Sequence, residues 1–178
     1  MNAKQARRRT LEVNWSGSWR QGLLFVVLVT GVVAFDQITK QWIRSHIAPL
    51  EVVPVFGCVN LCHVCNPGSA FGILARQSVL ITLAAVAGLT AILLLSHYFR
   101  ASSRLGNIAL ALVFGGAVGN LVDRFRFGCV TDFIDVRLWH DFHWPAFNLA
   151  DSAITVGVIA LLTFVIREWK TGDGTHPT

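Results

Sequence analysis

Long apolar stretches alternate with short charged segments along the chain. The apolar runs cover residues 22–35, 78–98, 105–122 and 147–166, and each ends at charge, Gly or Pro. Because an α-helix rises about 1.5 Å per residue, roughly 20 residues cross the hydrocarbon core of a bilayer. The pattern therefore predicts four transmembrane helices, at about 20–42, 78–98, 105–122 and 147–167.

The first apolar run is too short to cross a bilayer on its own. It must continue past Asp36 towards Lys40 and Trp42, which places an acidic side chain inside or near the membrane. Basic residues precede this run, so a cleavable signal peptide is the alternative interpretation. No small-residue cleavage pattern follows it, and we therefore expect a retained helix.

Two longer loops, 43–77 and 123–146, separate the predicted helices. Residues 50–65 are rich in Val, Phe and Leu with partial alternation, which is typical of short strands at a membrane surface. Residues 129–136 also have an extended pattern. In such a strand Asp132 and Ile134 share one face, whereas Asp135 lies on the other.

The composition agrees with a membrane environment. Hydrophobic residues make up 53% of the 178 residues, charged residues 14%, and the mean hydropathy is +0.55. A net charge of +5 could indicate a nucleic-acid partner in a soluble protein, but here the basic residues flank the predicted helices. By the positive-inside rule both termini then lie in the cytoplasm and the loops 43–77 and 123–146 lie outside. We expect one domain, residues 1–178, and no nucleic-acid partner.

Eight polar side chains are predicted to meet at the outer membrane face. Isolated charged groups at this depth are costly, so they mark function or a paired structural role. The eight are Asp36, Lys40, Asn120, Asp123, Asp132, Asp135, Asn148 and Asp151.

Structural roles are available to several of these residues. Asp36 and Lys40 are spaced i, i+4 and can pair on one helix face. Asp123 can pair with the adjacent Arg124 at the membrane interface, and Asn120 can form hydrogen bonds between helices. Asp135 is expected to be a support or a solvated loop charge.

Two further patterns concern the start of the last predicted helix and the packing of the third. Asn148 and Asp151 have a spacing that resembles a capping box at the start of the last helix. This role would still present the Asp151 carboxylate to a cleft. Gly115, Gly116 and Gly119 have the small-residue spacing that allows close approach of another helix.

Asp132 and Asp151 are the pair best placed for chemistry, because one lies on a loop strand and the other at a helix start. Two close carboxylates cannot both ionise cheaply, so one can act as a base and the other as an acid. Such a pair can activate water against a peptide carbonyl. Which aspartate takes which role is not assigned, since the proton belongs to the pair. The chain has no HExxH zinc motif and no GxSxG nucleophile motif.

A cysteine cluster precedes the second predicted helix. Cys58, Cys62 and Cys65 surround His63, and both zinc and a disulfide would fit such spacing. Free cysteines are the default expectation, and the state of Cys129 stays open.

Five separated blocks occur in order between the predicted spans. They are Asp36 with Lys40, the sequence NPGSAF at 66–71, the stretch 115–124 ending in GNLVDR, VTDFID at 130–135, and FNLAD at 147–151. Over about residues 22–168 the chain resembles the bacterial lipoprotein signal peptidases, also called signal peptidase II or prolipoprotein signal peptidases. Thr131 stands where that family commonly has valine, and neither the cysteine cluster nor the long basic start belongs to its pattern.

The resemblance implies an aspartic peptidase that removes the signal peptide from a diacylglyceryl-modified prolipoprotein, just before the lipid-modified cysteine. Asp132 and Asp151 are the implied catalytic residues, with no metal and no cofactor. The candidate residues for site support or substrate positioning are Asp36, Lys40, Asn66, Gly68, Asn120, Asp123, Arg124, Asp135 and Asn148.

The same resemblance implies an all-α integral membrane fold, a four-transmembrane-helix bundle with a small extracytoplasmic β cradle and a surface helix. We expect the protein in the bacterial inner membrane among membrane lipids, with its active site at the outer, periplasmic face. A monomer is the default expectation, and the sequence leaves the oligomeric state open. An ion-coupled transporter is the rival interpretation, but such proteins usually hold their key acid near the bilayer midplane. A scaffold protein would leave the convergent carboxylates unexplained.

Overall fold

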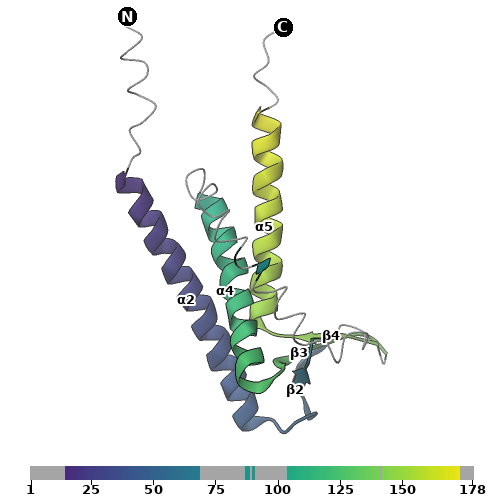
Figure 1. Cartoon of the computed structure of the whole chain (residues 1–178). Helices are drawn as coiled ribbons and strands as arrows, with labels where there is room; N and C mark the ends of the chain where they lie inside the picture. Colours follow the sequence, from purple (N-terminus) through teal and green to yellow (C-terminus); the bar gives the residue numbers. More distant parts are fainter. Residues whose placement is uncertain (1–14, 69–86, 89, 91–103, 141, 173–178) are drawn as a thin grey trace, which may run out of the picture.

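The computed structural model describes residues 15–68, 87–88, 90, 104–140 and 142–172. The N-terminal end of α2 and the C-terminal end of α5 lie at one end of the helix bundle, and the sheet lies at the other (Figure 1). The long helices are α2 (Trp15–His46), α4 (Arg104–Phe127) and α5 (Leu149–Gly172), and the strands are β1 (Val52–Phe56), β2 (Val59–Asn66), β3 (Val130–Trp139) and β4 (Phe142–Phe147).

Within the described ranges, three helices are long and apolar enough to cross a membrane. They cover Trp19–His46, Arg104–Phe127 and Leu149–Arg167, which agrees with three of the four predicted spans. The predicted helix at 78–98 lies outside the described residues except for three positions. Residues 69–77 of the loop 43–77, which was expected to form the β cradle and the surface helix, also lie outside them. The long α2 contains the acidic Asp36, as the extension of the first run predicted.

Several helix boundaries differ from the prediction. Helix α2 covers Trp15–His46 instead of 20–42, and α5 ends at Gly172 instead of 167. Helix α4 continues past residue 122 to Phe127, because its terminal charged residues are held by partners rather than ending the helix. Helix α5 begins at Leu149 instead of 147, because Asn148 caps it from outside.

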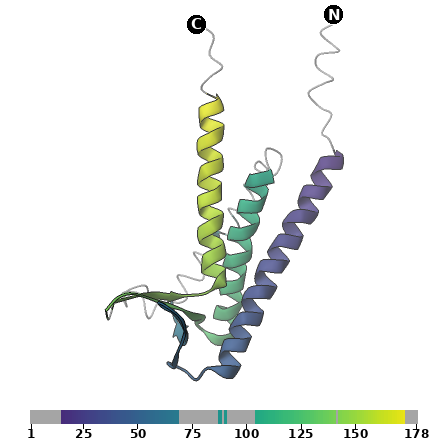
Figure 2. The ribbon, with the colours of Figure 1, turned by 180° about the vertical axis from the view of Figure 1, so that it is seen from behind.

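A four-stranded antiparallel sheet with the order β1-β2-β3-β4 fills the non-helical end. It confirms the strands expected within 50–65 and 129–136, whereas β4 was not predicted. Figure 2 shows the sheet extending sideways from the base of the helices. Ile43 and Ile47 at the end of α2 pack against Phe133 of β3, so a small apolar cluster attaches the sheet to the first helix.

Helix α4 lies against both other long helices through its glycines. A Cβ added at Gly115 would lie 2.9 Å from the Val32 Cβ of α2, and one at Gly119 would lie 2.7 Å from the Asp36 Oδ2 atom. A Cβ at Gly116 would collide with the backbone carbonyl of Ala150. The small-residue spacing therefore marks close helix packing, as predicted.

We expect Gly116→Ala to lower the free energy of unfolding by ~1–3 kcal/mol, because the methyl group can be accommodated only if α4 and α5 separate. Thermal unfolding of the purified proteins in detergent measures the effect. Gly22→Ala is the matched control, since nothing lies within 4 Å of its added Cβ. Equal unfolding temperatures for the two variants would contradict the packing argument.

Candidate active site

Asp132 and Asp151 line one cleft, where the sheet meets the start of α5. Asp132 lies on β3 and is 2% exposed, and Asp151 lies in the first turn of α5. The cleft has a volume of about 1190 Å³. Among the described residues it is lined by Val64, Cys65, Asn66, Pro67, Asp132, Phe142, His143, Trp144, Pro145, Ala146, Phe147, Asp151, Ser152, Thr155 and Val156.

The start of α5 is a capping box. The backbone N–H of Asp151 donates to the Asn148 Oδ1 atom at 2.9 Å, and the backbone N–H of Asn148 donates to the Asp151 Oδ2 atom at 3.3 Å. This confirms the pattern predicted from the spacing. The cap fixes the Asp151 side chain and leaves its other oxygen, Oδ1, for a partner outside the helix.

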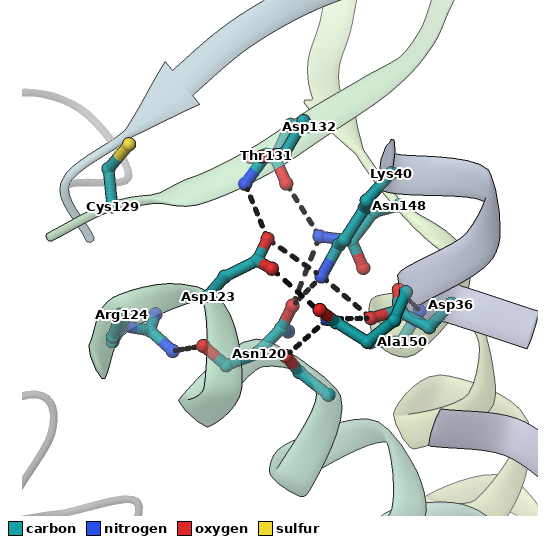
Figure 3. Close-up of polar contacts among 12 residues, drawn as sticks. Asp36, Lys40, Asn120, Asp123, Arg124, Cys129, Thr131, Asp132, Asn148 and Ala150 are labelled. Atoms are coloured by element: carbon teal, nitrogen blue, oxygen red, sulfur yellow. Dashed lines mark hydrogen bonds and ion pairs between the residues drawn. The ribbon is translucent and has the colours of Figure 1, made fainter. Parts of the chain in front are cut away.

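Two side-chain amides connect the carboxylates of Asp132 and Asp151. The Asn148 Nδ2 atom donates to Asp132 Oδ1 at 2.7 Å and to Asn120 Oδ1 at 3.2 Å. The Asn120 Nδ2 atom in turn donates to Asp151 Oδ1 at 2.7 Å. Asn120 therefore forms hydrogen bonds between segments, as predicted. Figure 3 shows Asn120 and Asn148 with the polar groups around them.

The environment of Asp132 favours its protonated form. The pKa of Asp132 is raised to about 6, mainly because the carboxyl is buried and also because of the nearby charge of Asp151, whereas hydrogen bonds from the amides of Asn66 and Asn148 lower it. The Asn66 Nδ2 atom lies 2.8 Å from Asp132 Oδ2. Asp132 can therefore retain a proton in a pH range where an ordinary aspartate is ionised.

This pKa predicts how stability depends on pH. The carboxyl of Asp132 has a pKa of about 6 in the folded protein and an ordinary value of 3.8, so the folded state binds the proton more tightly. The stabilisation from this tighter proton binding is complete at pH values below the ordinary pKa of 3.8. It is lost as the pH rises through the folded-state pKa of about 6. Relative to Asp132→Asn, we expect the wild-type free energy of unfolding to fall by ~2–3 kcal/mol between pH 4 and 7. Denaturant unfolding of both proteins at both pH values checks this, and parallel curves would contradict it.

A buried ion cluster lies next to the two amides (Figure 3). The Lys40 Nζ atom lies 2.9 Å from Asp36 Oδ2 and 3.3 Å from Asp123 Oδ2, and all three side chains are 0% exposed. Lys40 also donates to Asn120 Oδ1 at 2.9 Å. The predicted pairing of Asp36 with Lys40 is confirmed, and the same lysine holds an amide of the site.

The predicted pairing of Asp123 with Arg124 is wrong. In the part of the chain that the structure describes, Asp123 pairs with Lys40 and, at 3.6 Å, with Arg44, and it accepts the backbone N–H of Thr131 at 2.9 Å. Arg124 instead donates to the Asn120 carbonyl at 3.4 Å. Adjacent residues on a helix do not face each other, so the two side chains reach different partners. Asp123 thereby fixes the backbone next to Asp132.

Asp36 also holds the start of α5. Its Oδ1 atom accepts the backbone N–H of Ala150 at 3.0 Å, one of the helix-start groups that have no partner within the helix. A carboxylate in this position is favoured by the positive end of the helix dipole. Helix α2 therefore positions the turn that carries Asp151.

Two other candidate residues have separate roles. Asp135 faces away from the carboxylate pair and binds Asn60 at 2.7 Å and His143 at 2.8 Å. This supports the sheet, as expected for Asp135. The N–H of Gly68, at a φ of 104°, donates to Asn66 Oδ1 at 2.9 Å and so orients the amide that contacts Asp132.

The sequence interpretation missed Gln37, Arg44, Asn60 and His143. Gln37 Nε2 donates to Asp123 Oδ1 at 3.0 Å, and Arg44 Nη1 donates to Thr131 Oγ1 at 2.8 Å. Arg44 continues the i, i+4 series that Asp36 and Lys40 begin, which was a readable signal.

The cysteines differ from the default expectation. Cys65 and Cys129 form a disulfide, whereas Cys58 and Cys62 are free. The pairing joins positions 64 residues apart, so spacing within the cluster could not indicate it. No group of three metal-ligating side chains occurs within the described ranges.

The fold and site define a membrane-embedded enzyme whose carboxylates gather at one end of an apolar helix bundle. Residues 28–167 match the family described as signal peptidase (SPase) II, and the chain belongs to this peptidase family. The resemblance inferred from the five blocks is thus confirmed.

Individual relatives support this assignment over most of their length. The lipoprotein signal peptidase of Syntrophotalea carbinolica is 44% identical over 156 residues, covering 84% of this chain and 92% of the relative. That of Moorella thermoacetica is 45% identical over 140 residues, covering 77% and 89%. A bacterial membrane enzyme solved by the in meso method at 2.3 Å superposes with a TM-score of 0.73 at 29% identity, covering 87% of this chain and 94% of that one.

Proposed function

We propose that this peptidase is of the aspartic type and cleaves the signal peptide from diacylglyceryl-modified prolipoproteins just before the lipid-modified cysteine. The observation that carries the proposal is that Asp132 and Asp151 line one cleft and are bridged by two amides. Family membership and the relatives named lipoprotein signal peptidase support the substrate class.

In the proposed reaction the aspartate pair holds one proton. The ionised carboxylate accepts a proton from water as the water oxygen bonds to the peptide carbonyl carbon, and the protonated carboxyl donates a hydrogen bond to the carbonyl oxygen. The tetrahedral intermediate then collapses, the C–N bond breaks, and the leaving nitrogen takes a proton from the pair. The raised pKa of Asp132 supports a shared proton near neutral pH.

The surroundings of the pair suit a substrate that arrives through the membrane. Phe142, Trp144, Phe147 and Val156 make much of the cleft wall apolar, and the cleft adjoins the first turns of a membrane-spanning helix. Acyl chains already in lipid gain little from entering an apolar site, so recognition should depend on shape and polar contacts near the carboxylates.

The proposed orientation places the sheet at the outer face of the bacterial inner membrane and both termini in the cytoplasm. Basic residues flank the opposite ends of the helices, as the positive-inside rule requires. The Cys65–Cys129 disulfide at the sheet end supports the same orientation, because disulfides persist in oxidising compartments.

The proposal is tested with the purified full-length chain in lipid vesicles. A precursor carrying a diacylglyceryl cysteine should be cleaved, and mass spectrometry of the products should place the new amino terminus at that cysteine. The same precursor without the lipid is the control and should remain intact. Absence of cleavage, or equal cleavage of both precursors, would overturn the proposal. Proton flux into sealed vesicles without proteolysis would instead favour the transporter interpretation.

A further inference from the structure

The disulfide between Cys65 and Cys129 lies next to the proposed site. Cys65 directly precedes Asn66, the residue whose amide contacts Asp132, and Cys129 lies three residues before Asp132 on the same segment. Figure 3 shows Cys129 beside the start of β3 and close to the polar cluster. The proposed hydrolysis assigns no role to either cysteine.

This end of β2 has few other attachments among the described residues. Strand β1 pairs with β2 only over Val59–Cys62, so 64–66 pair with β3 alone. The β2–β3 register is irregular between Leu61 and Val64, and the pair Asn66–Val130 is the last of the ladder. The ends of secondary structure open more easily than their centres. A covalent link at this point therefore restrains a segment that only three residue pairs between β2 and β3 would otherwise hold.

The two faces of this segment have different tasks. Residues alternate between faces along a strand, so Asn66, Val130 and Asp132 share the face that carries the carboxylate. The disulfide and Thr131 lie on the other face. Asn66 contacts Asp132 diagonally across the β2–β3 pair, with Nδ2 2.8 Å from Oδ2. Any shift between the ends of the two strands changes that contact directly.

We propose that the Cys65–Cys129 disulfide is a redox-sensitive positioning element, which holds Asn66 against Asp132 and makes cleavage activity depend on the oxidised state. The claim that cleavage activity depends on the oxidised state rests on the proposed function. Reduction by a dithiol breaks the Sγ–Sγ bond, adds two electrons and two protons to form two thiols, and converts the reductant to its own disulfide. An oxidised dithiol carrier reverses the exchange.

The two sulfur atoms differ in access. Cys65 is an exposed residue, whereas Cys129 is buried. A thiolate therefore attacks the Cys65 sulfur first, with Cys129 as the leaving thiol.

The free cysteines do not provide an alternative bridge. Cys62 is 2% exposed, and burial together with the charges of Asp135 and Asp132 raises its pKa to about 11, so it stays protonated and unreactive. Cys58 is exposed but lies in the β1–β2 turn, at the other end of β2. Cys58→Ser therefore provides a background in which the disulfide is the accessible redox group.

The test compares oxidised, dithiothreitol-reduced and reoxidised Cys58→Ser protein in detergent, with alkylation and mass spectrometry reporting the state of Cys65 and Cys129. The first readout is the protonation midpoint of Asp132, followed as the infrared carboxyl band that Asp132→Asn removes. Loss of the Asn66 hydrogen bond should move this midpoint to higher pH, as Asn66→Ala should do in oxidised protein.

The second readout is kcat/KM for a lipid-modified precursor, which should fall 5–50-fold on reduction and recover on reoxidation, in the range expected for a displaced site-supporting group. The double variant Cys65→Ser/Cys129→Ser should show the reduced values and no response to dithiothreitol. An unchanged midpoint in verified reduced protein overturns the inference. If reduction lowers the unfolding temperature but leaves the protonation midpoint of Asp132 unchanged, the disulfide has a purely structural role. That result also overturns the inference. Inactive oxidised protein refutes the proposed function alone, because the midpoint still tests the positioning role.

Discussion

Asp132→Asn and Asp151→Asn are each expected to reduce cleavage of the lipid-modified precursor by about 10²–10⁴-fold. An amide cannot take a proton from water or return one to the leaving nitrogen, so either change removes half of the proposed pair. The remaining carboxyl also loses the neighbour that shares its proton. Single-turnover cleavage in detergent, read by the appearance of the released signal peptide, measures the loss.

The two losses should not add. Because the carboxylates act as one unit, the double variant should cleave about as slowly as the slower single variant. Glu51→Gln is the matched control, an equivalent carboxyl-to-amide change at an exposed position on the sheet side of the protein. Its cleavage rate should match the wild type. Retained activity in either purified single variant would refute the aspartate pair.

Much of this site could be predicted from local spacing. The capping box of Asn148 and Asp151 and the pairing of Asp36 with Lys40 are both contacts within one turn of a helix. Their geometry follows directly from the helical repeat. The alternation of β3 likewise separates Asp132 from Asp135 before any tertiary contact is known.

Contacts between distant segments could not be predicted in this way. Asp123 pairs with residues more than seventy positions earlier in the chain, and the Cys65–Cys129 link spans 64 residues. Local pattern offered Arg124 as the partner of Asp123, although neighbours on a helix face different directions. Strand β4 escaped prediction because its Pro145 and irregular pairing interrupt the alternation that marks a strand.

Lys40→Met is expected to lower the free energy of unfolding by about 3–5 kcal/mol. The change removes the cation that contacts both Asp36 and Asp123 while leaving the two carboxylates fully buried. Arg44 compensates only part of this charge, since it reaches Asp123 at 3.6 Å and has no ion pair with Asp36 within the described ranges. Thermal and denaturant unfolding in the same detergent measures the cost, with Arg137→Met, at an exposed β3 position, as the control that should change little.

The double variant Asp36→Asn/Lys40→Met separates the loss of charge balance from the loss of packing. An asparagine at position 36 can still accept the Ala150 N–H through Oδ1, and Asp123 keeps Arg44, so no carboxylate is left without a cation. The double variant should therefore be more stable than Lys40→Met alone, because an uncompensated buried charge costs more than a neutral polar group. A double variant that is less stable than the single one would contradict the charge argument and would show that the Asp36 carboxylate stabilises the site even without Lys40.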